Sequence, residues 1–245
     1  MRMARDWQLM NDQLRIDLLK QVDSLGLDQQ TAVRLFGLVF ARPQVKFVQE
    51  EILPQLDYFN DRAEGTTTFY FAGYHEPESE HEAITRVGDQ NWAFSCSAFN
   101  EIVGMMEGFS KWQYSGGTDL ILANARLVPH ESVHDFLRCE IDLSSAVSVE
   151  LSAMKAAGAI KDVASYFEEI FRYAKTQDGT DPCWGFSDRR GGRALLSALK
   201  ALAISLLPKA LRPEVEKAIF SAVRDLSGER TPHWSGPYPP KTKYA

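Results

Sequence analysis

Apolar residues recur roughly every three to four positions over much of this chain, which is the spacing of one face of an α-helix. Pro54 lies inside one such segment and predicts a kink, because proline cannot donate the helical hydrogen bond. Ser97 precedes another segment and predicts an N-cap. A further segment is apolar on most of its sides, as expected of a buried helix. The expected helices cover residues 6–25, 44–59, 97–111, 160–174, 194–207 and 213–226.

Other segments are rich in β-branched and aromatic residues, which favours β-strands. The clearest of them is Thr66–Tyr74. Residues 119–128 and 136–143 have the same character and are joined by a loop that contains Pro129, so we expect an antiparallel pair. Residues 33–40 are a continuous apolar run that fits either a buried strand or a helix. Shorter extended pieces are expected at 84–87 and 92–94.

The order of these elements predicts the fold class. If residues 35–40 form a strand, the middle of the chain runs strand, helix, strand, small insertion, helix, strand, strand, helix. This order is that of a thioredoxin-like core, and it predicts an α/β fold with a small mixed sheet and a C-terminal helical region. Dithiol chemistry does not follow, because the turn 41–44 holds no cysteine and no second thiol lies near Cys96. The strands are expected near residues 35–40, 67–74, 119–127 and 136–143.

Four regions are expected along the chain: an N-terminal helix, an α/β core, a helical region packed on that core, and an extended tail. The tail has four prolines and too few aliphatic residues to build a core of its own. Its aromatic residues, Trp234, Tyr238 and Tyr244, are costly to leave in water, so we expect the tail to dock on the helical region or on a partner. The expected bounds of the regions are 1–30, 31–145, 146–228 and 229–245.

Composition is that of an ordinary globular protein, with 44% apolar and 24% charged residues. A net charge of −6 does not favour broad electrostatic binding to nucleic acid. The longest apolar stretch, residues 194–207, is too short to span a bilayer, and no apolar signal segment follows the N-terminus. Cys96, Cys139 and Cys183 form no metal-binding pattern and are expected to be buried thiols. We therefore expect a cytoplasmic protein with no membrane partner and no cofactor.

A set of carboxylates is the first candidate for chemistry. It comprises Glu101 and Glu107 on a predicted helix, Asp119 at the start of a strand, and Glu140 and Asp142 on the next strand. Many metal-dependent nucleases gather Mg²⁺ with a helix Glu, a strand Asp and a strand Glu-x-Lys motif. Here Asp142 takes the place of the lysine, so the motif is incomplete. The favoured interpretation is the solvated face of a strand whose other face meets the core.

A basic turn, Ser187–Arg193, precedes a predicted helix and contains two glycines. Arg189, Arg190 and Arg193 are candidates for contact with an anion or a partner, although the turn lacks the order of a Walker A loop. A solvated basic turn is the favoured alternative.

Two other motifs combine residues that could react or bind metal. Residues His75–Glu82 contain two histidines and four glutamates, which could bind a divalent ion, although an acidic surface loop is favoured. The stretch Lys111–Leu122 holds a glycine pair and Ser115. A serine nucleophile would need a histidine such as His130 or His134 beside it, and nothing in the sequence places either there. A tight helix-to-strand turn is therefore the favoured interpretation.

Residues 50–125 resemble uncharacterised bacterial proteins found beside anti-phage defence genes. The resemblance rests on the stretch Lys111–Leu122, on Leu56–Arg62 and on the strand ending Ala72-Gly-Tyr74. It implies a cytosolic bacterial protein that works in a multi-protein defence assembly, and it carries no catalytic residue over to this chain.

Three functions follow from these observations. The first is a non-catalytic interaction or scaffold subunit with other protein subunits as partners, because no catalytic motif is complete and Trp, Tyr and Arg are typical of interfaces. Its expected partner contacts are Trp234 and Tyr238, together with the basic turn. The alternative is a metal-dependent, nuclease-like hydrolase that uses Asp119 and Glu140. An enzyme acting on nucleotides or NAD ranks last, since no Rossmann fingerprint is present.

Overall fold

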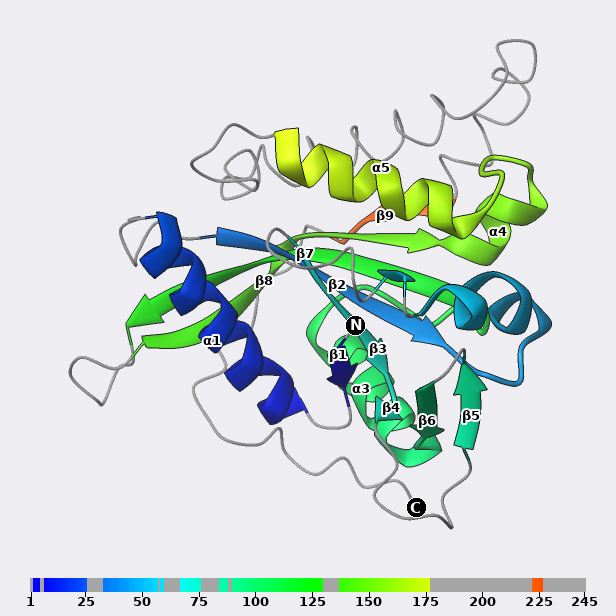
Figure 1. The fold of residues 1–245 in the computed structure, drawn as a ribbon, viewed down its shortest axis with the longest axis horizontal. Coiled ribbons are helices and arrows are strands. Elements are labelled where there is room, and N and C mark those ends of the chain that lie inside the picture. The colour runs from blue at the N-terminus through cyan, green and yellow to red at the C-terminus, as the bar shows by residue number, and fades with distance from the viewer. Residues whose placement is uncertain are drawn as a thin grey trace.

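A mixed β-sheet with helices on both faces forms the centre of the molecule (Figure 1). The computed structural model describes residues 2–4, 7–25, 33–56, 58–59, 67–75, 84–87, 90–129, 137–176 and 222–226. Within these residues the central sheet has six strands, in the order β1-β3-β2-β7-β8-β9. The predicted α/β class with a mixed sheet is therefore confirmed. The strands are β1 (Arg2–Ala4), β2 (Val33–Ala41), β3 (Thr67–Ala72), β7 (Thr118–Pro129), β8 (Leu137–Glu150) and β9 (Val223–Asp225).

Strand direction divides this sheet into a parallel and an antiparallel part. Strand β3 runs parallel to both of its neighbours, β1 and β2. Strands β7, β8 and β9 each run antiparallel to the strand before them in the sheet. Helix α1 (Trp7–Leu25) separates β1 from β2 in the sequence. Parallel neighbours need a long crossover connection, and residues 42–66 join β2 to its parallel neighbour β3. The antiparallel pair predicted around Pro129 is confirmed as β7 and β8.

Residues 33–40, for which the sequence allowed a strand or a helix, form β2. Leu35 and Val39 pack into the core on one face of the sheet. Phe36 and Phe40 pack into the core on the other face. A strand buried on both faces needs apolar residues at successive positions, which explains why this segment shows no alternation.

Each face of the sheet has its own hydrophobic core. Helices α1 and α3 (Cys96–Phe109) cover one face, with Leu14 and Phe99 among the buried side chains. The opposite face is covered by four helical segments. Figure 1 shows α4 and α5 above the sheet and α1 and α3 below it, so the described elements form three layers. The four segments are the π-helix η1 (Val48–Ile52), the 3₁₀ helix η2 (Leu53–Gln55), α4 (Leu151–Ala156) and α5 (Val163–Thr176).

A second, smaller sheet connects β3 to α3. Its strands β4 (Tyr74–His75), β5 (Ile84–Val87) and β6 (Gln90–Phe94) lie in the order β4-β6-β5. Gly73 turns the chain into this sheet with a positive φ of 81°. A Cβ atom at this position would lie 2.9 Å from the Ser95 carbonyl oxygen, so only glycine fits. The Ser95 amide donates a 2.8 Å hydrogen bond to the Gly73 carbonyl, which places the start of α3 beside the end of β3.

Helix caps and breaks differ in detail from the sequence predictions. The N-cap of α3 is Ser95 rather than Ser97, and its side chain accepts a 3.2 Å hydrogen bond from the Ala98 amide. Helix α3 ends at Phe109, two residues before the predicted end. Pro54, where the sequence predicts a kink, lies in the first turn of η2, where the π-helix gives way to a 3₁₀ helix.

The C-terminal part of the chain contributes a strand that the sequence analysis missed. Residues 213–226 were expected to form one helix, but Val223–Asp225 form β9, and Val223 pairs with Val149. The helical prediction is wrong here because pairing with the edge of β8 outweighs a local apolar spacing. Strand β8 itself continues to Glu150, across the expected boundary between residues 145 and 146.

Several predicted elements lie outside the described residues. They include the helix over 194–207, most of 213–222, the Pro-rich tail 229–245 and the turn Ser187–Arg193. No helix among the described residues is both long enough and apolar enough to cross a membrane.

Truncation of Phe167 tests the core between the sheet and α5. Phe167 is fully buried, and its ring centroid lies 4.7 Å from that of Phe59 and 5.1 Å from that of Phe69. We expect Phe167→Ala to lower the free energy of unfolding by about 3–5 kcal/mol, measured by urea denaturation. Arg172→Ala on the exposed side of the same helix is the control and should leave the midpoint almost unchanged. Equal midpoints for the two variants would contradict this packing.

Candidate functional site

Polar side chains gather at one end of the central sheet. The strand register aligns Ala41 at the end of β2 with Thr118 at the start of β7. It also aligns Asp119 with Glu150 at the end of β8. The loop 110–117, which joins α3 to β7, therefore lies beside the ends of three strands and is the centre of the candidate site.

Internal hydrogen bonds hold this loop in one conformation. The Ser110 hydroxyl caps α3 by donating to the Met106 carbonyl at 2.7 Å and accepts from the Trp112 amide at 3.1 Å. The Tyr114 amide donates to a carboxylate oxygen of Glu107 at 2.9 Å. The Tyr114 hydroxyl donates to the Gly117 carbonyl at 2.8 Å. Backbone groups that would otherwise need water are thus satisfied within the protein.

Asp119 is the most buried acidic group of the site, with 2% of its surface exposed. Its carboxylate accepts two hydrogen bonds from Ser115, one from the amide at 2.9 Å and one from the hydroxyl at 2.7 Å. The Ser115 hydroxyl oxygen also accepts from the Gly117 amide at 3.0 Å. The serine hydroxyl is therefore engaged both as donor and as acceptor, which is the arrangement of a turn.

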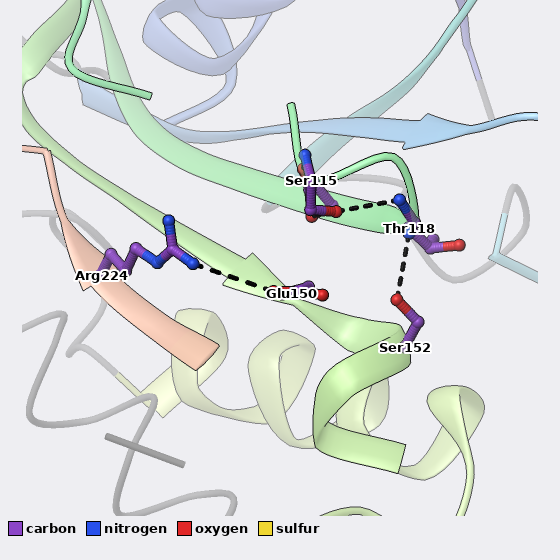
Figure 2. Close-up of polar contacts among 7 residues, drawn as sticks. Ser115, Thr118, Glu150, Ser152 and Arg224 are labelled. Atoms are coloured by element: carbon purple, nitrogen blue, oxygen red, sulfur yellow. Dashed lines mark hydrogen bonds and ion pairs between the residues drawn. The ribbon is translucent and has the colours of Figure 1, made fainter. Parts of the chain in front are cut away.

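The start of α4 and strand β9 complete this end of the sheet (Figure 2). The Ser152 hydroxyl accepts a 3.2 Å hydrogen bond from the Thr118 amide. A Cβ atom at Gly117 would lie 2.4 Å from that hydroxyl oxygen, so a larger residue here would displace the hydroxyl from the Thr118 amide. Arg224 of β9 forms an ion pair with Glu150, with a nitrogen-to-oxygen distance of 3.9 Å.

The surroundings of Asp119 act on its acidity in opposite directions. Burial raises the pKa of its carboxyl group above the ordinary value of 3.8, because the charged form loses solvation. The negative charge of Glu150 also raises this pKa. The hydrogen bonds from Ser115 and the charge of Arg224 lower it, and the net direction is upward.

A second group of contacts surrounds Arg42, which directly follows β2. Its guanidinium carbon lies 4.8 Å from the centre of the Phe99 ring and 5.8 Å from the centre of the Tyr114 ring. One of its terminal nitrogens donates a 2.9 Å hydrogen bond to the side-chain oxygen of Asn100. We call these four residues the Arg42 cluster. Both ring contacts are within the range of cation–π attraction.

Buried aromatic residues pack against the rings of the Arg42 cluster. The Phe40 ring lies 4.4 Å from Trp112 and 6.0 Å from Phe99, centre to centre. The Tyr114 ring lies 5.4 Å from Phe99 in an edge-to-face arrangement. Burial raises the pKa of the Tyr114 hydroxyl, and the nearby positive charge of Arg42 partly offsets the rise. The arginine is thus fixed on a rigid aromatic base.

The structure brings two of the predicted catalytic carboxylates to the same loop and leaves the third far away. Glu107 and Asp119 both bind amides of loop 110–117. Glu140 lies opposite Arg126 in the pairing of β7 with β8 and forms a 2.7 Å ion pair with it. Asp119 and Arg126 are seven positions apart on β7, which corresponds to about 20 Å. Asp119 and Glu140 therefore do not converge on one ion.

The remaining carboxylates of the predicted set are also separate from one another. Glu101 is exposed on α3, and Asp142 lies opposite Asn124 in the pairing of β7 with β8. Cys139 packs with Leu143 against the core on the α1 side, so this strand has one apolar and one polar face. Among the described residues, no three His, Cys, Asp or Glu side chains are grouped so that they could hold a metal ion.

The cysteine and histidine predictions have mixed outcomes. Cys96 is exposed at the start of α3, which contradicts its expected burial, because it lies on the outer side of a first turn whose Ala98 and Phe99 face the core. His75 is buried in β4, with 6% of its surface exposed, rather than part of a surface loop. The rest of that loop lies outside the described residues, as do Cys183, His130, His134, Arg189, Arg190, Arg193, Trp234 and Tyr238.

Sequence reasoning did not single out Arg42. The arginine was seen only as part of a turn before Pro43, and its partners lie more than fifty residues away in the sequence. The one local feature that points to Arg42 is its position. It is a charged residue directly after a strand that is buried on both faces, so it lies where that strand reaches the end of the sheet.

Comparison with known proteins yields no relative. No protein-family model, no curated protein and no solved structure matches this chain. The thioredoxin-like comparison drawn from element order therefore stays a prediction.

Two substitutions should move the acidity of Asp119 in opposite directions. Ser115→Ala removes a hydrogen bond that favours the charged form, so the pKa of the Asp119 carboxyl group should rise further. Glu150→Gln removes a nearby negative charge, so this pKa should fall. Carboxyl-carbon NMR titration of the labelled protein measures both. Shifts of the same sign in the two variants would contradict the proposed causes.

The raised pKa of Asp119 should also make the free energy of unfolding depend on pH. Because the pKa of Asp119 is higher in the folded chain than the ordinary 3.8, the folded state holds this proton more tightly than the unfolded state. The stability contributed by Asp119 is fully present below pH 3.8 and is lost as the pH rises through the folded-state pKa. Relative to Asp119→Asn, the natural protein should therefore lose unfolding free energy over that interval, measured by urea denaturation at each pH. A difference that grows with rising pH would contradict this.

Proposed function

We propose that this chain is a non-catalytic interaction subunit of a cytosolic bacterial assembly, and that the Arg42 cluster belongs to its docking surface. The observation that carries the proposal is an arginine fixed on two aromatic rings beside exposed polar residues of α3. Arginine and tyrosine dominate the binding energy of protein interfaces, and a side chain that is already ordered loses little entropy when a partner docks.

The engagement of the acidic residues supports a role without catalysis. Glu107 and Asp119 each bind loop amides, and Glu140 is paired with Arg126. These contacts give each carboxylate a structural partner and account for its position without catalysis. Within the described residues, the separation of Asp119 from Glu140 weighs against the hydrolase alternative.

The resemblance of residues 50–125 to proteins encoded beside anti-phage defence genes supports a defence assembly as the setting. Other protein subunits are the proposed partners. The basic turn with Arg189, Arg190 and Arg193, and the tail with Trp234 and Tyr238, remain proposed as further contacts.

A steric block on the docking surface tests this function. Ser97 is exposed and lies one helical turn before Asn100, on the same side of α3. We expect the tagged natural chain, purified from its own cells, to carry a stoichiometric protein partner, and Ser97→Trp to lose that partner. Lys20→Trp on the exposed side of α1 is the matched control and should keep the partner. Light scattering after size exclusion gives the mass of each complex, against 27.6 kDa for the chain alone.

Two results would contradict the proposal. One is a chain that is purified alone under all conditions, or that keeps its partner equally in both tryptophan variants. The other is cleavage of plasmid or RNA that requires Mg²⁺ or Mn²⁺, stops with EDTA and is lost in Asp119→Asn, since that result would make the chain a hydrolase.

A further inference from the structure

We infer that the Arg42 cluster binds a carboxylate of an acidic segment in the partner protein. The inference rests on the proposed function and adds the chemistry of the partner. It follows from a contrast between Arg42 and four other arginines of the described chain. Arg126, Arg138, Arg172 and Arg224 each lie within ion-pair distance of a glutamate.

Arg42 has no such counter-charge among the described residues. Its protein contacts are two ring faces and the neutral amide of Asn100. Its Nε atom is buried without an acceptor, but the same holds for the ion-paired Arg126 and Arg138, so the feature that sets Arg42 apart from them is the missing counter-charge. A half-buried cation without a counter-charge is costly, because part of its hydration is lost and nothing of opposite charge replaces it. A carboxylate from outside would supply the missing charge.

The geometry of the cluster prepares Arg42 for this ligand. Phe99 and Tyr114 contact the guanidinium group through their ring faces, which limits its rotation, and Asn100 fixes one terminal nitrogen. A planar guanidinium held in one orientation can donate two parallel hydrogen bonds to one carboxylate. Lysine in the same place would offer a point charge without this match.

Nearby acidic residues do not already fill the site. Glu107 is engaged by the Tyr114 amide, and Asp119 is engaged by Ser115. Glu101 follows Asn100 directly, but successive residues of a helix are rotated by about 100° from each other, so it points to another side of α3. The exposed neighbours on the first turn of the helix, Cys96 and Ser97, carry no acidic group.

Charge also distinguishes a protein partner from nucleic acid. Binding a phosphate backbone requires several basic side chains along one surface, and the net charge of this chain is −6. The Arg42 cluster offers one cation next to aromatic rings. That combination suits a single glutamate, aspartate or chain-terminal carboxylate whose aliphatic part contacts the partly exposed ring of Tyr114.

NMR titration of the full-length chain tests the inference directly. The probe is an acetylated, amidated octapeptide of alternating glutamate and glycine, and its matched control carries glutamine in place of glutamate. We expect the glutamate peptide to shift the Nε–H signal of Arg42 and the amide signals of Asn100 and Tyr114, and the glutamine peptide to leave them unchanged.

Variants of Arg42 assign the effect. Arg42→Met keeps the aliphatic contact with the rings and should lower the affinity for the glutamate peptide by at least about tenfold. Arg42→Lys keeps the positive charge but lacks the planar guanidinium group, so its affinity for the glutamate peptide should lie between those of the natural chain and Arg42→Met. Arg172→Met removes an exposed arginine on α5 and should bind like the natural chain. Circular dichroism melting of each variant establishes that it is folded.

Each outcome bears on one proposal. Equal binding of the two peptides, no shift at Arg42 with millimolar glutamate peptide, or natural affinity in folded Arg42→Met would overturn the carboxylate inference. If the assembly isolated from cells is lost in Ser97→Trp but kept in Arg42→Met, the interaction function stands and the carboxylate inference is wrong. If the glutamate peptide binds as expected but Ser97→Trp keeps the assembly, the docking surface of the proposed function is wrong.

Discussion

The pairing of β2 with β7 is the contact on which both the core and the candidate site depend. It extends from Val33 opposite Arg126 to Ala41 opposite Thr118, in the middle of the sheet. Because both strands are buried on their two faces, this pairing holds the cores of the α1–α3 layer and the α4–α5 layer together. The same register brings Arg42, just past the end of β2, to the loop that enters β7. A shift of one residue would exchange the two faces of β2 and separate Arg42 from Tyr114.

The polar residues at this end of the sheet form hydrogen bonds that stabilise the loop 110–117. Ser115, Glu107 and Asp119 satisfy amides and hydroxyls that the tight connection from α3 to β7 would otherwise leave without partners. Buried carboxylates are often taken as signs of catalysis. Here the raised pKa of Asp119 has a structural cause, since its burial at the start of β7 outweighs the hydrogen bonds from Ser115. The hydrogen bonds of the same loop also fix Tyr114, whose ring lies against Arg42.

Much of the fold could be predicted from local pattern. The strands β3, β7 and β8 and the buried faces of α1 and α5 follow from apolar spacing and residue type, which act over a few neighbouring positions. Strand β9 could not be predicted, because Val223 lies in a segment whose spacing also fits a helix and its partner Val149 is distant in sequence. The N-cap at Ser95 was missed by two residues, since the hydrogen bond from Ser95 to Gly73 that positions the start of α3 is a tertiary contact.

The α/β class and the mixed sheet could be inferred from the amino-acid sequence, because hydrophobic periodicity is a local property that does not depend on which segments pair. The sequence also showed which residues are acidic but not what they contact, since the same residue type can bind a loop amide, a counter-charge or a metal. Three contacts became visible in the folded chain alone: Glu140 pairs with Arg126, Asp119 binds Ser115, and Arg42 lies on Phe99 and Tyr114 without a carboxylate among the described residues. Interactions between charged side chains depend on distance and burial, and strand pairing sets both once remote segments have come together.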